Sequence, residues 1–579
     1  MERIDSYRPG KRFWNGLSYA GLMTLLFFAP FERLTPIISI PGQKVTNVEM
    51  LLFLALVSWA AGCWMGGRVP RLKTGLTLPA ACLLGVMALS ALLASGYQSE
   101  ALRFTARFGA GFLAHLLVVN AITSWRRQLG LAMVCAGAGT CVSLVGILDS
   151  LRVAPVLEWL RAYRPTEAWV GAQMRISSTL QYPTITSMYL EIVFGLALGL
   201  LLAAVQKRNW SWVLPIFAAL SLMGGCIILT LTRAGLVCLA AALFLAASSW
   251  LFRRGADRGF WALVVLALVI AALLGGTLWS NSEYWLRLTT RNQLDWYRAE
   301  YDVPALLRFE PGQLRKVRVT ITNTGRATWH PGGPTPFRLA YHWLADKEQV
   351  VIDYEGLRTD LPASVASGRS LSLQARVKAP SRPGRYRLAW DLLQERRFWF
   401  SVENSPSALT RVEVNGTASK EAPPETFPIP HPRLIPDRAT LWRAAARMLW
   451  TRPLLGVGPD NFRLLYQDSL DLPLGDRRYH THNLYVEFFV CTGLIGGVVF
   501  IWLLWRVVAN LLGQWKESPG ERLPQLIGVS TAVLVVFVHG FFDYFLEFTP
   551  TYLMIWTTFG LAVSRPGAGQ EQEKHADRV

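Results

Sequence analysis

Long apolar runs recur along most of this 579-residue chain, separated by short polar loops. A run of about 20 apolar residues is long enough to cross the hydrocarbon core of a bilayer as a helix. Buried core helices of a soluble protein would not supply so many runs of this length. The pattern predicts a polytopic α-helical membrane protein with twelve transmembrane helices, at residues 14–32, 47–66, 76–95, 103–123, 128–149, 184–205, 211–231, 234–252, 259–279, 484–511, 524–543 and 548–564.

The long segment between the ninth and tenth runs has a different pattern. Apolar residues such as Val317, Val319 and Ile321 alternate with polar ones, and turn-forming pairs such as Pro383-Gly384 separate the alternating stretches. Alternation over about a hundred residues predicts an inserted all-β domain, an immunoglobulin-like sandwich. We therefore expect six parts: transmembrane helices 1–9 at 1–283, the sandwich at 300–405, a Pro-rich linker at 416–436, a loop with an amphipathic helix at 437–483, helices 10–12 at 484–565 and a disordered tail at 566–579.

The distribution of charge predicts the topology. Charged residues make up 17% of the chain, below the quarter typical of soluble proteins, yet the net charge is +19. An excess of positive charge can indicate nucleic-acid binding, but the basic residues fill both termini and alternate short loops, among them Arg68, Lys73, Lys207, Arg254 and Arg522. The positive-inside rule places those loops and both termini in the cytoplasm. We therefore expect no nucleic-acid partner, and chemistry on the extracytoplasmic face, where the long loops lie.

The cysteines add no candidate chemistry. All seven lie in apolar runs, without a CxxC pair, and the long polar segment contains none. A disulfide scaffold or a cysteine-ligated metal is therefore not expected.

The most distinctive stretch is 452–496, in which the polar sequence Tyr479-His480-Thr481-His482-Asn483 leads directly into an apolar run. Histidine titrates near neutral pH, so His482 at a membrane surface is a candidate general base. The alternative is a histidine near a helix start that only hydrogen-bonds. His480 and His482 could also form an H-x-H metal pair, but no acidic or cysteine cluster completes such a site at a recognisable spacing. We predict no metal and no other cofactor.

Arginines supply the candidate anion site. Arg233 stands between two apolar runs with almost no loop around it, and an arginine this close to hydrocarbon is usually functional. Its guanidinium can bind a diphosphate through two parallel hydrogen bonds, although it could instead reach lipid headgroups. Arg175 and Arg438 are weaker candidates, with solvated surface arginines as the alternative. Asp543, at the end of the eleventh run, could orient a base or an acceptor sugar, or be a hydrated carboxylate at a helix end.

These motifs resemble the signature of the O-antigen ligase and O-antigen polymerase superfamily. The Pro453…Gly456-x-Gly458 turn, then His482-Asn483 and Gly493…Gly496, carry the resemblance, and Thr232-Arg233-Ala234 matches its [ST]-R-[GA] corner. The resemblance implies a GT-C-like fold in the bacterial inner membrane. It also implies transfer of an oligosaccharide or polysaccharide from an undecaprenyl-diphosphate carrier to an acceptor hydroxyl. Under it His482 is the base, Arg233, Arg175 and Arg438 hold the diphosphate, and the supporting residues are His480, Asn483, Arg478 and Asp543.

Several functions stay open at this point. The acceptor could be a lipid-anchored sugar, another carrier-linked repeat as in a polymerase, or a protein hydroxyl. Because arginines can compensate the charge of the departing phosphate, we expect an inverting, metal-independent glycosyltransferase. A transporter of lipid-linked glycans is the rival from another class, but the chain shows no internal repeat. A third possibility is an assembly protein whose β-domain stacks sugars on Trp329, Trp343 and Trp399, although such residues are more often core. Beyond donor, acceptor and bilayer, other polysaccharide-assembly proteins are possible partners.

Overall fold

The computed structural model describes residues 9–40, 43–66, 69–170, 173–290, 295–333, 335–346, 350–403, 405–416, 427–428, 436–470, 479–517 and 520–565. The chain divides into two compact units. We call the first the helical unit (Met1–Ala168, Arg175–Thr277 and Pro436–Val579) and the second the β unit (Trp169–Met174 and Leu278–Ile435). The predicted tail and most of the predicted linker lie outside the described residues.

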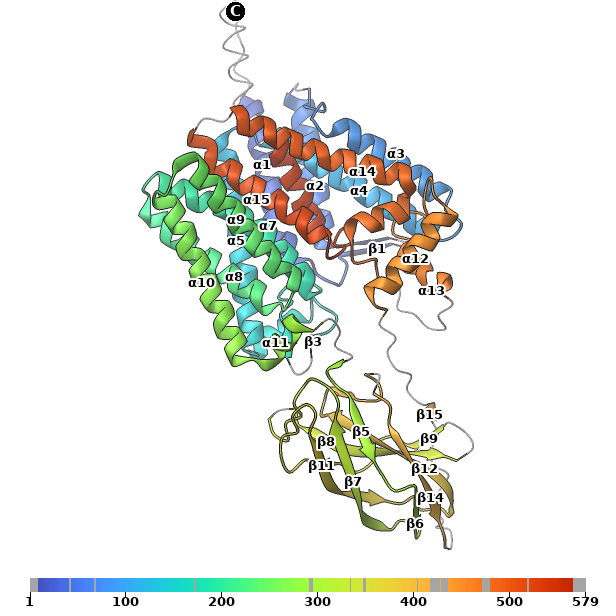
Figure 1. Ribbon diagram of the computed structural model, residues 1–579. Coiled ribbons are helices and arrows are strands. Elements are labelled where there is room, and N and C mark those ends of the chain that lie inside the picture. Colours follow the sequence, from blue (N-terminus) through green and yellow to red (C-terminus); the bar gives the residue numbers. More distant parts are fainter. Residues whose placement is uncertain are drawn as a thin grey trace, which may run out of the picture. The chain divides into compact units, whose positions relative to one another are not determined.

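Helices make up most of the helical unit (Figure 1). The long ones are α1 Pro9–Phe28, α2 Asn47–Gly66, α3 Thr77–Leu92, α4 Gln98–Ala121, α5 Trp125–Ser150, α7 Pro183–Gln206, α8 Trp210–Leu229, α9 Arg233–Arg254, α10 Arg258–Ser280, α12 Arg438–Thr451, α14 Leu484–Glu517, α15 Leu523–Gly540 and α16 Thr549–Val563. The short elements are η1 Ala29–Phe31, β1 Ile38–Ile40, β2 Gln43–Val45, α6 Ala154–Leu160, α13 Phe462–Ser469 and η3 Gly520–Arg522. The strands β3 Ala168–Val170 and β4 Gln173–Arg175 pair with each other, and their residues Trp169–Met174 belong to the β unit.

Each of the twelve predicted spans coincides with one of these helices. Among the described residues, nine helices are long and apolar enough to cross a membrane: α2, α4, α5, α7, α8, α9, α10, α14 and the helix formed by η3 with α15. The apolar stretch Gly16–Phe31, which includes most of α1, and the helices α3 and α16 are shorter. The chain is therefore a multi-pass helical membrane protein, and the count of twelve stays a prediction.

Helix α7 forms the core of the helical unit. Its side chains are buried from Ile185 to Val205, and it packs against both α15 and α9, which also contact each other (Figure 1). A Cβ on Gly199 would lie 2.7 Å from Pro524 O and 3.1 Å from Gly528 Cα. Small residues allow such close packing of membrane helices. This contact fixes α7 against α15, and both helices carry residues of the candidate site.

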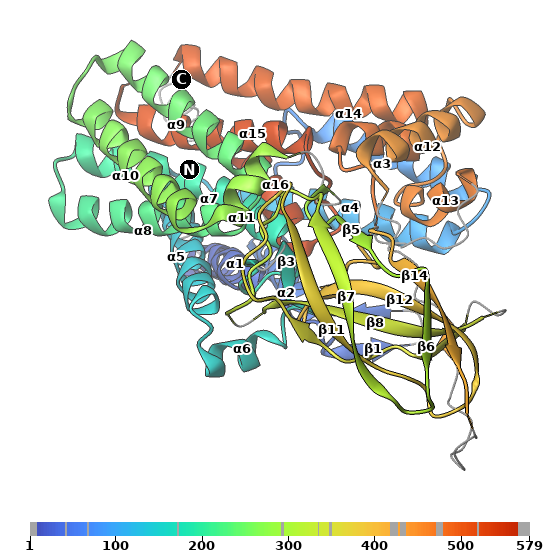
Figure 2. The ribbon, with the colours of Figure 1, turned by 60° about the horizontal axis from the view of Figure 1, so that its bottom comes forward.

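Helix α14 is broken at Gly493, whose φ of 69° and ψ of −172° interrupt the helical backbone. A loop preceding α13 fills the break. Its Val457 and Gly458 N–H groups donate to Val490 O and Cys491 O, each at 3.0 Å, while Leu494 N donates to Pro453 O at 2.7 Å. Backbone groups that lose their helical partners are thus paired. Helices α12 and α13 lie beside the part of α14 that precedes the break at Gly493 (Figure 2).

Two sheets form the β unit. The larger one has the order β15-β9-β8-β12-β14-β6, with β10 on β8 and β13 on β12, and the smaller one has the order β11-β7-β5. β14 and β6 are parallel, and the other pairs are antiparallel. The elements are α11 Ser282–Thr289, β5 Ala299–Asp302, β6 Leu306–Phe309, β7 Leu314–Asn323, β8 Phe337–Ala345, β9 Val350–Asp353, β10 Thr359–Asp360, β11 Ser370–Lys378, β12 Gly384–Gln394, β13 Phe398–Trp399, β14 Ala408–Val414 and β15 Phe427–Pro428.

The predicted alternation is confirmed in β7, where Val317, Val319 and Ile321 are buried between the two sheets. Side chains point to opposite faces of a strand in turn, so a period of two buries one face. Trp329 and Trp343 belong to this core and are at most 2% exposed, so they do not offer a surface for sugars, whereas Trp399 is half-buried. The unit is therefore a β-sandwich with an aromatic core.

Candidate active site

Asn483 ties the start of α14 to the end of α15. Its Oδ1 accepts hydrogen bonds from the N–H groups of Tyr485 and Val486, each at 3.0 Å, and its Nδ2 donates to Phe541 O at 3.1 Å. Asparagine is a preferred helix N-cap because its side chain pairs N–H groups that the helix start leaves unsatisfied. The cap therefore holds the preceding residue, His482, beside the segment that follows α15.

His482 forms a hydrogen bond with Asp543. The distance from Nδ1 to Oδ1 is 2.9 Å, and the side chains are 35% and 16% exposed. The backbone of His482 has a φ of 51°, in the left-handed region. Burial raises the pKa of Asp543, but the hydrogen bond from His482 and the charges of His482 and His539 lower it to about 2. Asp543 is thus a carboxylate that can accept a hydrogen bond from Nδ1–H, which leaves Nε2 as the basic nitrogen.

His480, two residues earlier, has different surroundings. Nδ1 lies 3.0 Å from Glu487 Oε1, Nε2 lies 3.1 Å from Glu547 Oε2, and Asp460 Oδ1 is 4.0 Å from Nε2. Burial lowers the pKa of His480, but the charge of Glu487 and the hydrogen bonds to both glutamates raise it to about 10. His480 is an imidazolium held between carboxylates. Both of its nitrogens are engaged, which disfavours the H-x-H metal pair.

The sequence analysis missed the acidic partners of His480. Asp460 has a φ of 65° and accepts two hydrogen bonds from Arg463, at 3.0 and 2.8 Å. Glu487 Oε2 also accepts the N–H of Thr481 at 2.9 Å. Glu487 lies within a predicted span, and an ionisable residue in such a run is a usable signal. Asp460 lies in a polar loop, where no comparable signal exists.

The three predicted arginines lie on a connected path toward His482. Arg175 donates from Nε to Thr230 O at 2.9 Å and from Nη2 to Thr232 Oγ1 at 3.1 Å, so it contacts the corner that precedes Arg233. Arg233 begins α9 and lies close enough to Arg438 for the two positive charges to repel. Two neighbouring guanidinium groups favour an anion between them.

Arg438 links this cationic group to the histidine. It begins α12, and its Nη2 donates to Phe542 O at 2.6 Å, one residue before Asp543. The structure thus places Arg438 next to the segment that carries Asp543, while Arg175 contacts the corner before Arg233. Arg478, the remaining predicted supporting residue, lies outside the described residues.

A second buried pair, also missed, lies behind Asp543. His539 Nδ1 is 2.8 Å from Glu191 Oε2, and Glu191 Oε1 accepts from Ser187 Oγ at 2.7 Å. His539 is one helical turn before Asp543, whose N–H donates to His539 O at 3.0 Å. Glu191, Cys238 and His539 have ligand atoms within 4.8 Å of one another, the one such metal-sized group of three among the described residues. A glutamate inside the predicted span 184–205 was the signal for this pair.

Residues 413–501 match the family model described as O-antigen ligase. The match includes α12, α13, both histidines of the 480–482 segment and the first half of α14, and it ends before Asp543. No curated protein matches the chain. This multi-pass membrane protein therefore carries, at residues 413–501, a domain that matches the O-antigen ligase family model.

Proposed function

We propose that this protein transfers a glycan from an undecaprenyl-diphosphate carrier to an acceptor hydroxyl on the extracytoplasmic side, with inversion at the anomeric carbon and without a metal. The observation that carries the proposal is the His482–Asp543 pair beside Arg438, which in turn neighbours Arg233. It joins the two groups that such a reaction requires, a base for the acceptor and positive charge for the leaving group.

His482 acts as the general base in this proposal. Asp543 accepts a hydrogen bond from the Nδ1–H of His482, so the lone pair of Nε2 is free to take the proton of the acceptor hydroxyl as the hydroxyl oxygen attacks the anomeric carbon. Asp543 also stabilises the imidazolium that forms. The attack forms the new glycosidic bond and breaks the bond from the anomeric carbon to the phosphate oxygen. The electron pair leaves with undecaprenyl diphosphate.

The arginines stabilise that leaving group. Arg233 and Arg438 repel each other in the protein alone, so a diphosphate bound near them relieves the repulsion and gains charge-assisted hydrogen bonds. Arg175, bonded to the Thr230–Thr232 corner, supports the position of Arg233. Positive charge placed where negative charge develops lowers the barrier, which makes a divalent metal unnecessary.

The predicted topology completes the proposal. We infer twelve spans, cytoplasmic termini and an Ig-like identity for the sandwich. Arg253 donates to Trp515 O at 2.8 Å and Arg254 to Gly520 O at 2.7 Å, so basic residues gather at the ends of α9 and α14 opposite to Arg233 and His482.

In a chain with its native cysteines replaced, an impermeant maleimide should label Ser364→Cys and spare Lys207→Cys in intact spheroplasts. Labelling of Lys207→Cys alone would reverse the orientation.

The reaction is tested with purified protein, a purified undecaprenyl-diphosphate-linked glycan and EDTA. Wild type should form a glycosidic bond to a lipid-anchored core acceptor, whereas His482→Ala and Arg233→Ala should lose at least 99% of this rate, as expected for a lost base or oxyanion contact of about 10²-fold or more. His330→Ala and Arg103→Ala, at exposed positions, are matched controls. Equal product from all variants would refute the assignments. Donor crossing the bilayer without a new bond would identify a transporter.

A further inference from the structure

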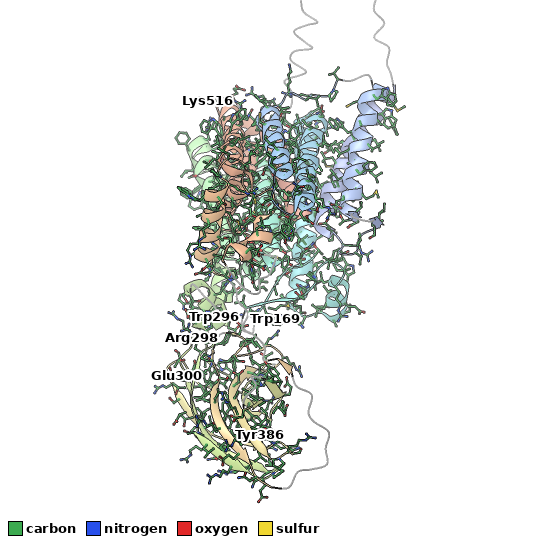
Figure 3. All side chains as sticks on the ribbon, turned by 90° about the vertical axis from the view of Figure 1, so that its right-hand side faces the viewer. Trp169, Trp296, Arg298, Glu300, Tyr386 and Lys516 are labelled. Carbon is green, nitrogen blue, oxygen red and sulfur yellow. The ribbon has the colours of Figure 1, made fainter. Side chains whose placement is uncertain are left out.

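A cavity of about 380 Å³ opens in the β unit between the segment that follows β9 and the turn from β11 to β12. Cavities of a few hundred Å³ are the size at which proteins bind small molecules or parts of larger ones. It lies outside the residues that match the ligase family. Tyr386, which lines the cavity, can be located in Figure 3, where it lies well apart from Trp296 within the β unit.

Three aromatic residues line the cavity: Tyr386, which is partly exposed, and the buried Tyr341 and Trp343 behind it, and hydrogen bonds hold all three in place. Tyr341 and Trp343, each 2% exposed, bond the backbone of Lys378: its N–H donates to Tyr341 Oη at 2.9 Å, and Trp343 Nε1 donates to its O at 3.1 Å. Tyr386 is half-buried, and its Oη donates to Arg382 O at 2.9 Å. Its ring packs edge-on against Trp343, with the centroids 5.9 Å apart. The aromatic surface is therefore preorganised.

Charged side chains of both signs line the rest of the cavity. Asp353 and Glu355 supply carboxylates, and Lys378 and Arg382 supply cations. An apolar ligand would remove these four groups from water without replacing their hydrogen bonds, which is unfavourable. A phosphate would meet two carboxylates. A hydroxyl group both donates and accepts, so a ligand with many hydroxyl groups suits this mixture of donors and acceptors.

We propose that this cavity is a glycan-binding site. The C–H face of a pyranose packs on the ring of Tyr386, while its hydroxyl groups donate to Asp353 and accept from Lys378. Binding here is separate from transfer, because these residues belong to the β unit and His482 belongs to the helical unit. That the bound glycan is the one attached to the carrier lipid rests on the proposed function.

The test uses the full-length His482→Ala chain in lipid nanodiscs, which removes turnover, and isothermal titration calorimetry. The probe is the oligosaccharide released by mild acid from the carrier-lipid pool of the cells that produce the protein. Tyr386→Ala should weaken binding at least tenfold, and Asp353→Asn should weaken it several-fold. Tyr386→Phe keeps the ring and should retain most of the affinity. Leu409→Ala, 50% exposed on β14, is the control and should bind as its parent does.

Two outcomes would overturn the proposal: no binding to the parent chain, or unchanged binding to both Tyr386→Ala and Asp353→Asn. The thermal midpoint of each variant must match that of Leu409→Ala, and Tyr386→Phe distinguishes loss of the ring from loss of folding. The readout is binding without turnover. A chain that binds the oligosaccharide but forms no glycosidic bond in the transfer assay would therefore refute the proposed function and leave this site standing.

Discussion

His480 and His482 are two residues apart, yet the fold gives them opposite chemistry. His480 is buried with a glutamate at each nitrogen, whereas His482 is 35% exposed with one carboxylate partner, Asp543. Two carboxylates stabilise the imidazolium so strongly that proton release becomes unfavourable near neutral pH. One carboxylate orients the ring and leaves the other nitrogen for substrate. The number of acidic partners and the access to water, rather than the sequence motif, separate His480 from the proposed base, His482.

The two histidines also differ in the structural elements that they contact. His480 bridges Glu487 of α14 and Glu547, which precedes α16, so its charge joins two elements of the helical unit. The partner of His482, Asp543, follows Phe542, whose carbonyl accepts a hydrogen bond from Arg438. We therefore expect changes at His480 to affect mainly stability and changes at the His482–Asp543 pair to affect mainly rate.

The largest expected effect comes from Asp543→Asn. The amide keeps the size of the side chain but cannot stabilise an imidazolium at His482, so kcat should fall on the order of 10²-fold or more. The KM for the acceptor should change little, because the proposed role of Asp543 is exerted in the transition state. Steady-state kinetics of glycan transfer measure both parameters. Asp302→Asn, exposed in the β unit, is the control, and a rate equal to wild type for Asp543→Asn would remove Asp543 from the mechanism.

The next effect is on stability. His480→Gln removes the cation between Glu487 and Glu547, and breaking a buried charge pair by removing one partner costs about 3–5 kcal/mol. The free energy of unfolding, measured by titrating SDS into protein in bicelles, should fall by this amount. His330→Gln should leave it unchanged. A loss of transfer without a loss of stability would mean that His480, too, takes part in the reaction.

The pH dependence of stability gives a smaller effect with a definite sign. The pKa of His480 is raised from 6.5 to about 10 in the folded protein, because its acidic partners outweigh burial. Its contribution is fully present below pH 6.5 and is lost as the pH rises through about 10. The stability difference between wild type and His480→Gln should therefore shrink between these values. A constant difference across this range would contradict the assignment of an imidazolium.

Local patterns account for what the sequence predicted. Twenty-residue apolar runs and strict alternation specify helices and strands without reference to distant residues, so the spans and the sandwich were predictable. The break of α14 was not, because Gly493 leaves the helix only where the loop at Pro453–Gly458 supplies replacement hydrogen bonds. That loop is about forty residues away in the chain, and no periodicity reports such a pairing.

The candidate site likewise contains residues that the sequence indicated and contacts that it did not. His482 and Arg233 stood out because polar residues beside apolar runs are conspicuous, whereas Arg438 was named from the family resemblance. The difference between His480 and His482 was hidden, since it depends on Glu547 and Asp543, more than sixty residues later. Only the packing of α14 against α15 and α16 decides which acid meets which histidine.

The smallest expected effect tests whether Asn483 positions only His482, or His480 as well. Asn483→Ala removes the N-cap of α14 and the bond to Phe541 O, which should lower the free energy of unfolding by about 1 kcal/mol. Asn483→Ser restores a capping oxygen without reaching Phe541, so it should regain stability but not the full rate of transfer. His480 keeps its glutamates in both variants, and the alkaline loss of stability should stay as in wild type. If the pH of this alkaline loss of stability also shifts, the Asn483 cap supports both histidines. The proposed roles of His480 and His482 would then be less independent than their separate contacts indicate.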